Sequence, residues 1–168
     1  MKRTIVKYVI FFTFFFALTL SIAYARASKK KFTLDYKNFN YIQPGSYEGV
    51  HWDSKNKVIY IWAVWCGVCK ANLPILKFNN QLFGKVFNIS FISVEEGSTG
   101  KIEINRYIQN QNINFPVILG NEDLLKRLDV NSFPTTIFIN SKDEVLFVDS
   151  GIINPISYFL RMLFTNLF

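Results

Sequence analysis

Cys66 and Cys69 are the only two cysteines of the chain, and they lie three positions apart. They follow the apolar run 58–64, at a point where a strand pattern gives way to a helix pattern. A cysteine at a helix N-terminus faces free backbone N–H groups and the positive end of the helix dipole, and both favour its thiolate. The second cysteine lies one turn further on, within reach of the first sulfur. The pair predicts thiol–disulfide exchange, with Cys66 attacking and Cys69 resolving.

Two other uses of the cysteines are less well supported. A purely structural disulfide would close a loop too small to remove much entropy from the unfolded chain. Structural zinc takes about four ligands, and the chain offers these cysteines and a single histidine, His51. We expect no metal and no cofactor besides the Cys66–Cys69 disulfide, although two copies sharing a four-cysteine site remain an alternative.

The neighbours of the cysteines are expected to shape the site. Trp65 precedes Cys66 and is placed to shield one side of the sulfur. Gly67 and Val68 separate the two cysteines, where the intervening residues help to set the redox potential, and they supply neither a charge nor a proline. These residues are therefore candidates for active-site support.

A second signal is Phe133-Pro134, which stands directly before the predicted strand 135–140. A proline before a strand can hold a cis peptide bond, and such a bend can present backbone groups beside the sulfurs to an incoming peptide. An ordinary trans proline at the start of an edge strand is the other interpretation, and the residues alone favour it.

Alternating apolar segments predict the elements that position these residues. Helix N-caps are expected at Asn121 and Asn154, and Pro74 is expected to kink the helix that follows the cysteines. The predicted strands are 58–64, 86–94, 115–119, 135–140 and 145–149, and the predicted helices are 66–83, 101–109, 121–128 and 156–167. This order predicts an α/β fold in which a central mixed sheet has helices on both faces.

The run Trp62–Lys70, followed by Pro74, resembles the active site of the thioredoxin superfamily, and Val130–Ile139 resembles that family's cis-proline strand. With the apolar N-terminal segment, the chain is most similar to membrane-tethered TlpA-like thiol–disulfide oxidoreductases, including the suppressor-of-copper-sensitivity D proteins. The resemblance covers roughly residues 45–168. It implies a thioredoxin fold, a cis bond before Pro134 and Cys66 as the exposed nucleophile.

Three positions depart from this pattern. Many thioredoxins have a buried acidic residue six positions before the first cysteine, where this chain has Tyr60. Some TlpA-like reductases have a glutamate three residues after the second cysteine, where this chain has Asn72. The cytochrome-maturation branch usually has a glutamate after the cis-proline, where this chain has Thr135. The first two departures leave open how Cys69 loses its proton.

The N-terminal segment 1–27 predicts export. Three basic residues precede 18 uncharged residues rich in Phe, Ile and Leu, over positions 8–25. The sequence Ala23-Tyr24-Ala25 suits signal-peptide cleavage, whereas 18 apolar residues can just span a bilayer. We favour a retained membrane anchor over a cleaved signal peptide. Residues 28–45 are expected to form a linker and 46–168 the thioredoxin-like domain, in the periplasm or cell envelope beside the inner membrane.

The remaining charged residues give weaker indications. The formal charge of +7 is concentrated near the N-terminus, and no basic stripe with interleaved aromatics runs along the domain, so we expect no nucleic-acid partner. His51 is expected to have a surface or packing role rather than that of a catalytic base. Glu95 and Glu96 follow a predicted strand end, where a carboxylate could approach the site, but a solvated loop is the favoured interpretation.

The sequence as a whole predicts a protein-disulfide oxidoreductase of the cell envelope. We expect it to reduce disulfides in exported proteins, because the proteins it resembles are mostly reductants. A membrane-embedded electron donor would then re-reduce Cys66 and Cys69. The alternatives are a disulfide-forming oxidant, a cytochrome c maturation thioredoxin, and a non-enzymatic module that binds thiol-bearing or copper-loaded clients.

Overall fold

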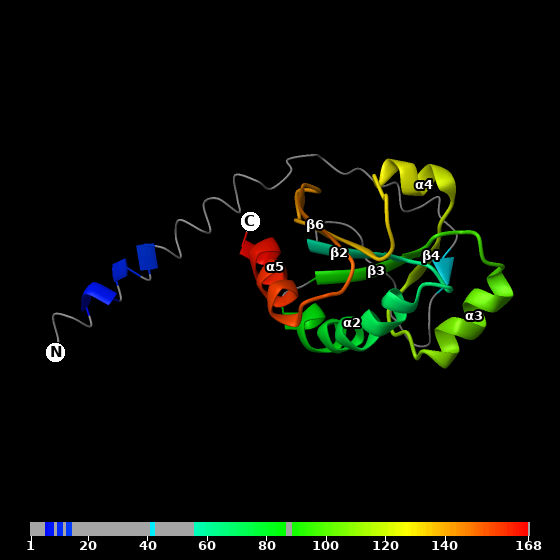
Figure 1. Cartoon of the computed structure of the whole chain (residues 1–168), viewed down its shortest axis with the longest axis horizontal. Coiled ribbons are helices and arrows are strands. Elements are labelled where there is room, and N and C mark those ends of the chain that lie inside the picture. The colour runs from blue at the N-terminus through cyan, green and yellow to red at the C-terminus, as the bar shows by residue number, and fades with distance from the viewer. Residues whose placement is uncertain are drawn as a thin grey trace.

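The computed structural model describes residues 6–8, 10–11, 13–14, 41–42, 56–86 and 89–167 (Figure 1). Most of the predicted signal or anchor segment lies outside these residues, as do His51 and the expected domain boundary near residue 46. Within the part of the chain that is described, no helix combines the length and the apolar composition needed to cross a bilayer.

The described chain forms a six-stranded mixed sheet in the order β1-β4-β3-β2-β5-β6. Strand β2 is central, and all seven of its residues are buried, which explains why its sequence is almost continuously apolar. It pairs parallel to β3 and antiparallel to β5. The strands are β1 (Tyr41–Ile42), β2 (Asn56–Trp62), β3 (Ile89–Glu95), β4 (Val117–Leu119), β5 (Thr135–Ile139) and β6 (Val145–Ser150).

Helices cover both faces of this sheet, as the alternation of strand and helix patterns predicts (Figure 1). Side chains of α2, α3 and α5 pack with Tyr60, Trp62 and Phe138 on one face. Side chains of α4 pack with Ile59 and Ile137 on the other. The helices are α2 (Gly67–Val86), α3 (Lys101–Asn110), α4 (Glu122–Arg127) and α5 (Pro155–Leu167).

Local sequence signals explain where the helices begin. The side chain of Asn121 accepts a hydrogen bond from the Leu124 N–H at 2.8 Å, and that of Asn154 accepts from Ile156 and Ser157 at 3.0 and 3.2 Å. Pro74 lies inside α2, which continues past it to Val86. Both predicted caps are therefore present, and α2 extends three residues beyond the predicted end at residue 83.

One strand comes from a segment that the sequence assigns to the linker 28–45. Residues Tyr41–Ile42 form β1, which pairs antiparallel to β4 at the edge of the sheet. The pairing positions Tyr41 opposite Ile118 and Ile42 opposite Val117. Chain upstream of residue 46 thus contributes to the sheet.

Candidate active site

The two cysteines lie between the carboxyl end of β2 and the start of α2. Their sulfurs form a disulfide, and their Cα atoms are 5.2 Å apart. A turn closed by the hydrogen bond from Cys66 N–H to the Ala63 carbonyl, at 3.1 Å, carries the chain from the strand into the helix. Cys66 is the last residue before α2, and Cys69 belongs to its first turn.

The start of α2 presents a backbone donor to the first sulfur. The Cys69 N–H donates to Cys66 Sγ at 3.1 Å, and the first turn of α2 contains no acidic residue. Both features stabilise a thiolate on Cys66, because they add positive electrostatic potential without a compensating negative charge. The geometry thus favours Cys66 as the nucleophile of the pair.

The two sulfurs differ in access to solvent. Cys66 is 7% exposed and Cys69 is 1% exposed. Cys66 is more accessible than Cys69, as expected. In the disulfide state, however, Cys66 is a buried residue and not an exposed one. An incoming sulfur can therefore reach Cys66 more easily than Cys69.

An aromatic surface borders Cys66. Trp65 is 66% exposed, and its ring meets Phe133 edge-on with centroids 5.9 Å apart. The indole Nε1 donates to Glu96 Oε1 at 3.1 Å, which fixes the ring from its other side. Val68 adds a further exposed apolar side chain next to the sulfurs. Exposed apolar side chains grouped in this way are typical of a contact surface.

The structure brings both sequence signals together at this surface. The Phe133–Pro134 bond is cis, as the family resemblance implies and contrary to the interpretation that the residues alone favour. Phe133 packs against the hydrophobic cluster that contains Cys66 and Cys69. The Pro134 carbonyl accepts a hydrogen bond from Gly151 N–H at 2.9 Å. Gly67 has open space around its Cα, so nothing close by requires a glycine there.

Tyr60 and Asn72 occupy the two positions where this chain departs from the family pattern. The Tyr60 hydroxyl donates to the Cys69 carbonyl at 3.1 Å. Burial raises the pKa of Tyr60 well above its usual value, so the phenol stays neutral. Asn72 donates to the Gly151 carbonyl at 3.0 Å and accepts from Ile153 N–H at 3.1 Å. Asn72 therefore ties α2 to the loop before α5 and supplies no acid.

Glu95 is not in a solvated loop, as the sequence interpretation had it. It is the last residue of β3 and is 0% exposed. Its Oε2 accepts a hydrogen bond from Gly97 N–H at 2.9 Å. Burial raises the pKa of its carboxyl. The alternation of side chains along β3 predicts that Glu95 is buried, because Phe91, Ser93 and Glu95 share one face and Phe91 belongs to the core.

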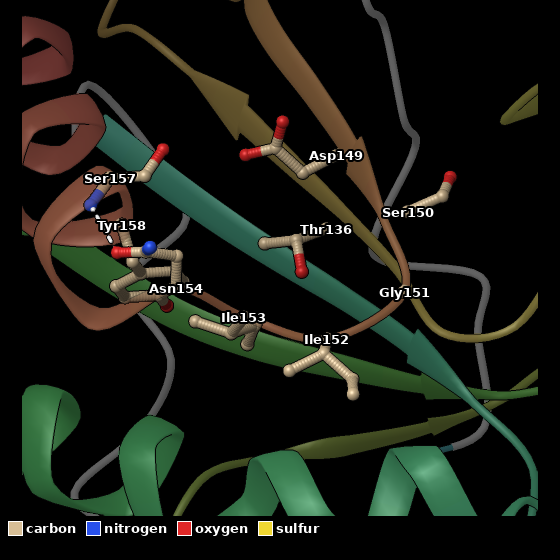
Figure 2. A pocket seen from close by; sticks show the side chains of 9 residues that line it. All are labelled: Thr136, Asp149, Ser150, Gly151, Ile152, Ile153, Asn154, Ser157 and Tyr158. Atoms are coloured by element: carbon tan, nitrogen blue, oxygen red, sulfur yellow. Dashed lines mark hydrogen bonds between the residues drawn. The ribbon is translucent and has the colours of Figure 1, made fainter.

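A cavity of about 150 Å³ lies between β5, β6 and the start of α5 (Figure 2). Its lining is partly polar and includes Thr136, Asp149, Ser157 and Tyr158. Arg161 Nε contacts Asp149 Oδ2 at 2.6 Å. Neither cysteine lines this cavity, so we do not assign it to the exchange site. In the described part of the chain, no three His, Cys, Asp or Glu residues form a group that could hold a metal ion.

Comparison with known proteins identifies the family of this chain. Residues 27–148 match the AhpC/TSA family. The chain belongs to the AhpC/TSA family. This AhpC/TSA member is 30% identical over 102 residues to the thiol–disulfide oxidoreductase ResA of Bacillus subtilis, in an alignment that covers 59% of the chain and 56% of ResA. The chain thus spans little more than half the length of this relative.

Solved structures confirm the fold of this AhpC/TSA member. A thiol–disulfide isomerase from Corynebacterium glutamicum superposes with a TM-score of 0.67 at 15% identity, covering 82% of this chain and 96% of that one. An exposed lipoprotein thioredoxin from Streptococcus pneumoniae superposes with a TM-score of 0.59 at 20% identity, covering 66% and 85%. The predicted thioredoxin fold and the homology to thiol–disulfide oxidoreductases are therefore confirmed.

Proposed function

We propose that this protein is a thiol–disulfide oxidoreductase that acts on protein disulfides through Cys66 and Cys69. The observation that carries the proposal is the position of Cys66 at the start of α2, where the Cys69 N–H points at its sulfur. This arrangement stabilises the thiolate that exchange requires. The homology to ResA supports the same chemistry.

Exchange would proceed in two displacement steps. The Cys66 thiolate attacks one sulfur of a client disulfide, so that a mixed disulfide forms and the other client sulfur leaves as a thiolate. Cys69 loses its proton and attacks Cys66 Sγ, which forms the Cys66–Cys69 disulfide and releases the second client thiolate. The client gains two electrons and the enzyme loses two, so an external donor must reduce the enzyme again.

The aromatic surface is the proposed client contact. Trp65, Phe133 and Val68 would pack against apolar client side chains, and the backbone around Pro134 would align the client strand beside Cys66. Gly67 completes the set as an uncharged residue between the two sulfurs. Trp65 and Phe133 are already in contact in the disulfide form, so the surface is formed before a client arrives.

We also propose an extracytoplasmic location. Residues 1–27 would act as the anchor or signal peptide, and a connecting segment would lead from them to the domain, which includes β1 at Tyr41–Ile42. The matching lipoprotein thioredoxin is described as exposed, which supports this placement. A donor embedded in the inner membrane would supply the electrons, and reduction of exported proteins is the proposed direction.

Cysteine variants of the full chain test the reaction. Cys66→Ser should abolish reduction of a disulfide peptide, because no nucleophile remains. Cys69→Ser should trap mixed disulfides with client proteins, which non-reducing gels reveal. A client that still binds after both cysteines are replaced would instead support a binding module without turnover.

The reduction potential of the Cys66–Cys69 couple tests the direction. A value near that of thioredoxin, about −270 mV, would support a reductant. A value towards about −120 mV would make the protein a disulfide donor and contradict the proposed direction.

A further inference from the structure

Three buried polar atoms near the disulfide have no hydrogen-bond partner among the described residues. They are Trp62 Nε1, Tyr107 Oη and Glu95 Oε1. Buried polar groups in native proteins are almost always paired, so an unpaired group needs an explanation, and a catalytic or redox role is one. Glu95 Oε1 is an acceptor on an ionisable carboxyl, Trp62 Nε1 can only donate, and Tyr107 Oη can donate or accept.

The three groups lie together on one face of the sheet. Trp62 and Glu95 are register partners on the adjacent parallel strands β2 and β3, so their side chains leave the sheet on the same side. Tyr107 of α3 stacks on Trp62 with ring centroids 5.1 Å apart. Trp62 and Tyr107 also belong to the hydrophobic cluster that contains Cys66 and Cys69. We call Trp62, Glu95 and Tyr107 the buried polar cluster.

Tyr60 connects this cluster to the resolving cysteine. It lies two residues before Trp62 on the same face of β2, and its hydroxyl donates to the Cys69 carbonyl at 3.1 Å. Tyr107 stacks on Trp62, two residues along β2 from Tyr60, and its charge raises the pKa of Tyr60 slightly. The polar groups thus extend from Glu95 to the backbone of Cys69.

The backbone fixes Glu95 inside the protein. Gly120 N–H donates to the Glu95 carbonyl at 2.8 Å. Gly97, with φ of +99°, packs on Gly120, and a Cβ at Gly97 would come within 2.3 Å of the Gly120 carbonyl oxygen. A Cβ at Gly120 would come within 2.2 Å of the Glu95 carbonyl oxygen. The close approach of the two glycines therefore fixes the backbone of Glu95.

Several groups influence the ionisation of this carboxyl. Glu96 is the charged neighbour that opposes it, and the Gly97 N–H, which donates to Oε2 at 2.9 Å, favours it. The ionisable side chains that pack on this face of the sheet include Tyr107 of α3 and Tyr60 of β2. Burial is the largest influence, and it raises the pKa of Glu95. The carboxyl is thus set to gain a proton more readily than a surface glutamate.

We propose that Glu95 accepts the proton that leaves the Cys69 thiol during disulfide exchange, with the hydroxyls of Tyr107 and Tyr60 as the relay between them. The inference rests on the proposed exchange function and supplies the acid–base group that positions 60 and 72 lack. In the resolving step, the proton moves from Cys69 Sγ to the Glu95 carboxylate and Cys69 attacks Cys66 Sγ. The client thiolate departs and takes a proton from solvent. Re-reduction returns the Glu95 proton to Cys69.

The test follows the reduction of a self-quenched disulfide peptide by the full chain in detergent, with dithiothreitol as electron donor, from about pH 5 to pH 9. In Glu95→Gln, the resolving step should slow on the order of tenfold or more at neutral pH. Its pH profile should shift to alkaline values, and the peptide–Cys66 mixed disulfide should accumulate. Glu95→Asp should restore part of the rate. Glu103→Gln, on the exposed face of α3, is the matched control and should retain the wild-type profile.

The outcomes separate the two proposals. If the wild type reduces the peptide no faster than Cys66→Ser does, the proposed function fails. If the wild type is active and Glu95→Gln keeps its pH profile without accumulating mixed disulfide, only the role of Glu95 fails. Infrared difference spectra of the wild type, oxidised against reduced, provide a test that needs no variant. A change in a protonated-carboxyl band supports the proposal, and no such change overturns it.

Discussion

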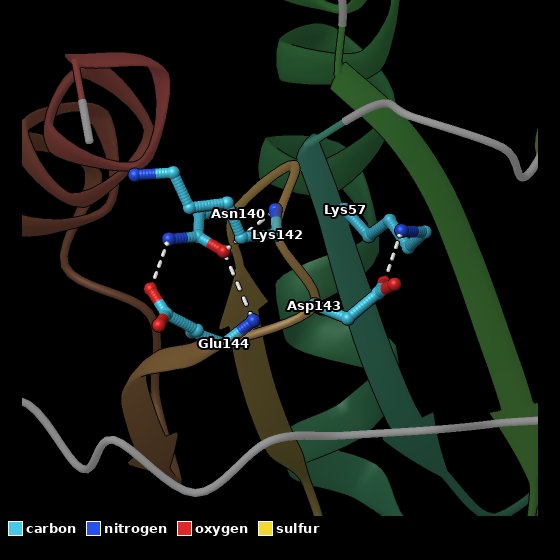
Figure 3. A network of polar contacts seen from close by, with 5 residues as sticks. All are labelled: Lys57, Asn140, Lys142, Asp143 and Glu144. Atoms are coloured by element: carbon cyan, nitrogen blue, oxygen red, sulfur yellow. Dashed lines mark hydrogen bonds and ion pairs between the residues drawn. The ribbon is translucent and has the colours of Figure 1, made fainter.

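Buried polar groups near the two ends of β2 differ in whether they have hydrogen-bond partners. At the amino end, Lys57 is 1% exposed, and its Nζ contacts Asp143 Oδ1 at 2.7 Å (Figure 3). The neighbouring Asn56 donates to Asn166 Oδ1 at 3.3 Å. At the carboxyl end, the side-chain groups of Trp62, Glu95 and Tyr107 each leave an atom without a partner among the described residues.

The amino end shows what a structural polar network looks like in this fold. Figure 3 shows the turn between β5 and β6, where Asn140 accepts from Lys142 N–H and Glu144 N–H and donates to Glu144 Oε2. Asp143 in the same turn reaches Lys57 on β2. These contacts hold the hairpin against the central strand. Satisfied groups stabilise a fold, whereas an unsatisfied buried group costs free energy.

The largest effect on stability is expected from breaking the ion pair at the amino end. Asp143→Ala would leave the ammonium of Lys57 buried without its counter-charge. We expect the free energy of unfolding to fall by about 2–3 kcal/mol, as urea denaturation would measure. Lys57→Met keeps the volume without the charge and should cost less than about 1.5 kcal/mol. Both variants should retain exchange activity. A loss of activity in the folded protein would contradict a purely structural role for the polar network at the amino end of β2.

A somewhat smaller effect is expected at Asn72, which lies between the two regions. Asn72→Ala would leave the Gly151 carbonyl and the Ile153 N–H without their partner, at a cost of about 1–3 kcal/mol. Urea denaturation measures the loss, and Lys70→Ala, at an exposed position on the same helix, is the control. Asn72→Asp should also destabilise, because a carboxylate cannot donate to the Gly151 carbonyl. An unchanged stability for Asn72→Ala would show that the loop before α5 is held by other contacts.

The sequence is sufficient for the fold and for the cysteine pair, because both depend on local patterns. The apolar run of β2, the caps at Asn121 and Asn154 and the spacing of Cys66 and Cys69 are all visible in short windows. The short edge strand β1 has only two residues, which is too few for a periodic signal. The cis bond before Pro134 required the family resemblance, since the residues alone favour the trans form.

Glu95 was misassigned because its burial depends on contacts distant in sequence. In the chain it stands beside Glu96 and before a Gly-Ser-Thr-Gly stretch, which resembles a solvated loop. In the fold, β3 extends to Glu95, and Gly120 closes over its backbone. The alternation of β3 indicated an inward side chain, but adjacent acidic residues favoured solvent. Strand pairing with Trp62 decides between these two signals.

Ionisation of Glu95 predicts a pH-dependent difference in stability at the carboxyl end. Because burial raises its folded pKa above the reference value of 4.5, the contribution of Glu95 to stability is fully present below pH 4.5 and is lost as pH rises through the folded pKa. Glu95→Gln does not ionise and escapes this loss. Relative to the wild type, its free energy of unfolding should therefore increase with pH by on the order of 1 kcal/mol.

Urea denaturation at a series of pH values measures this difference, and the exposed Glu103→Gln provides the baseline for removal of one carboxyl. The difference between Glu95→Gln and the wild type should level off at high pH, once Glu95 is fully ionised. A difference that stays constant across the series would mean that Glu95 titrates like an exposed glutamate. Glu95 would then not differ from an ordinary carboxyl, and the contrast between paired groups at the amino end of β2 and unpaired groups at its carboxyl end would be lost.

The smallest stability effect is expected at the aromatic surface, where the polar contacts face solvent. Glu96 accepts from Trp65 Nε1, but Trp65 is 66% exposed, so water can replace the carboxylate when it is removed. Glu96→Ala should change the free energy of unfolding by less than about 0.5 kcal/mol. Its effect should appear instead in client binding, because the indole is no longer held against Phe133. We expect a higher KM for a disulfide peptide with an apolar residue beside its cysteine and little change for oxidised glutathione, which offers no such side chain. An equal change for both substrates would mean that Glu96 acts on the sulfurs and not on Trp65.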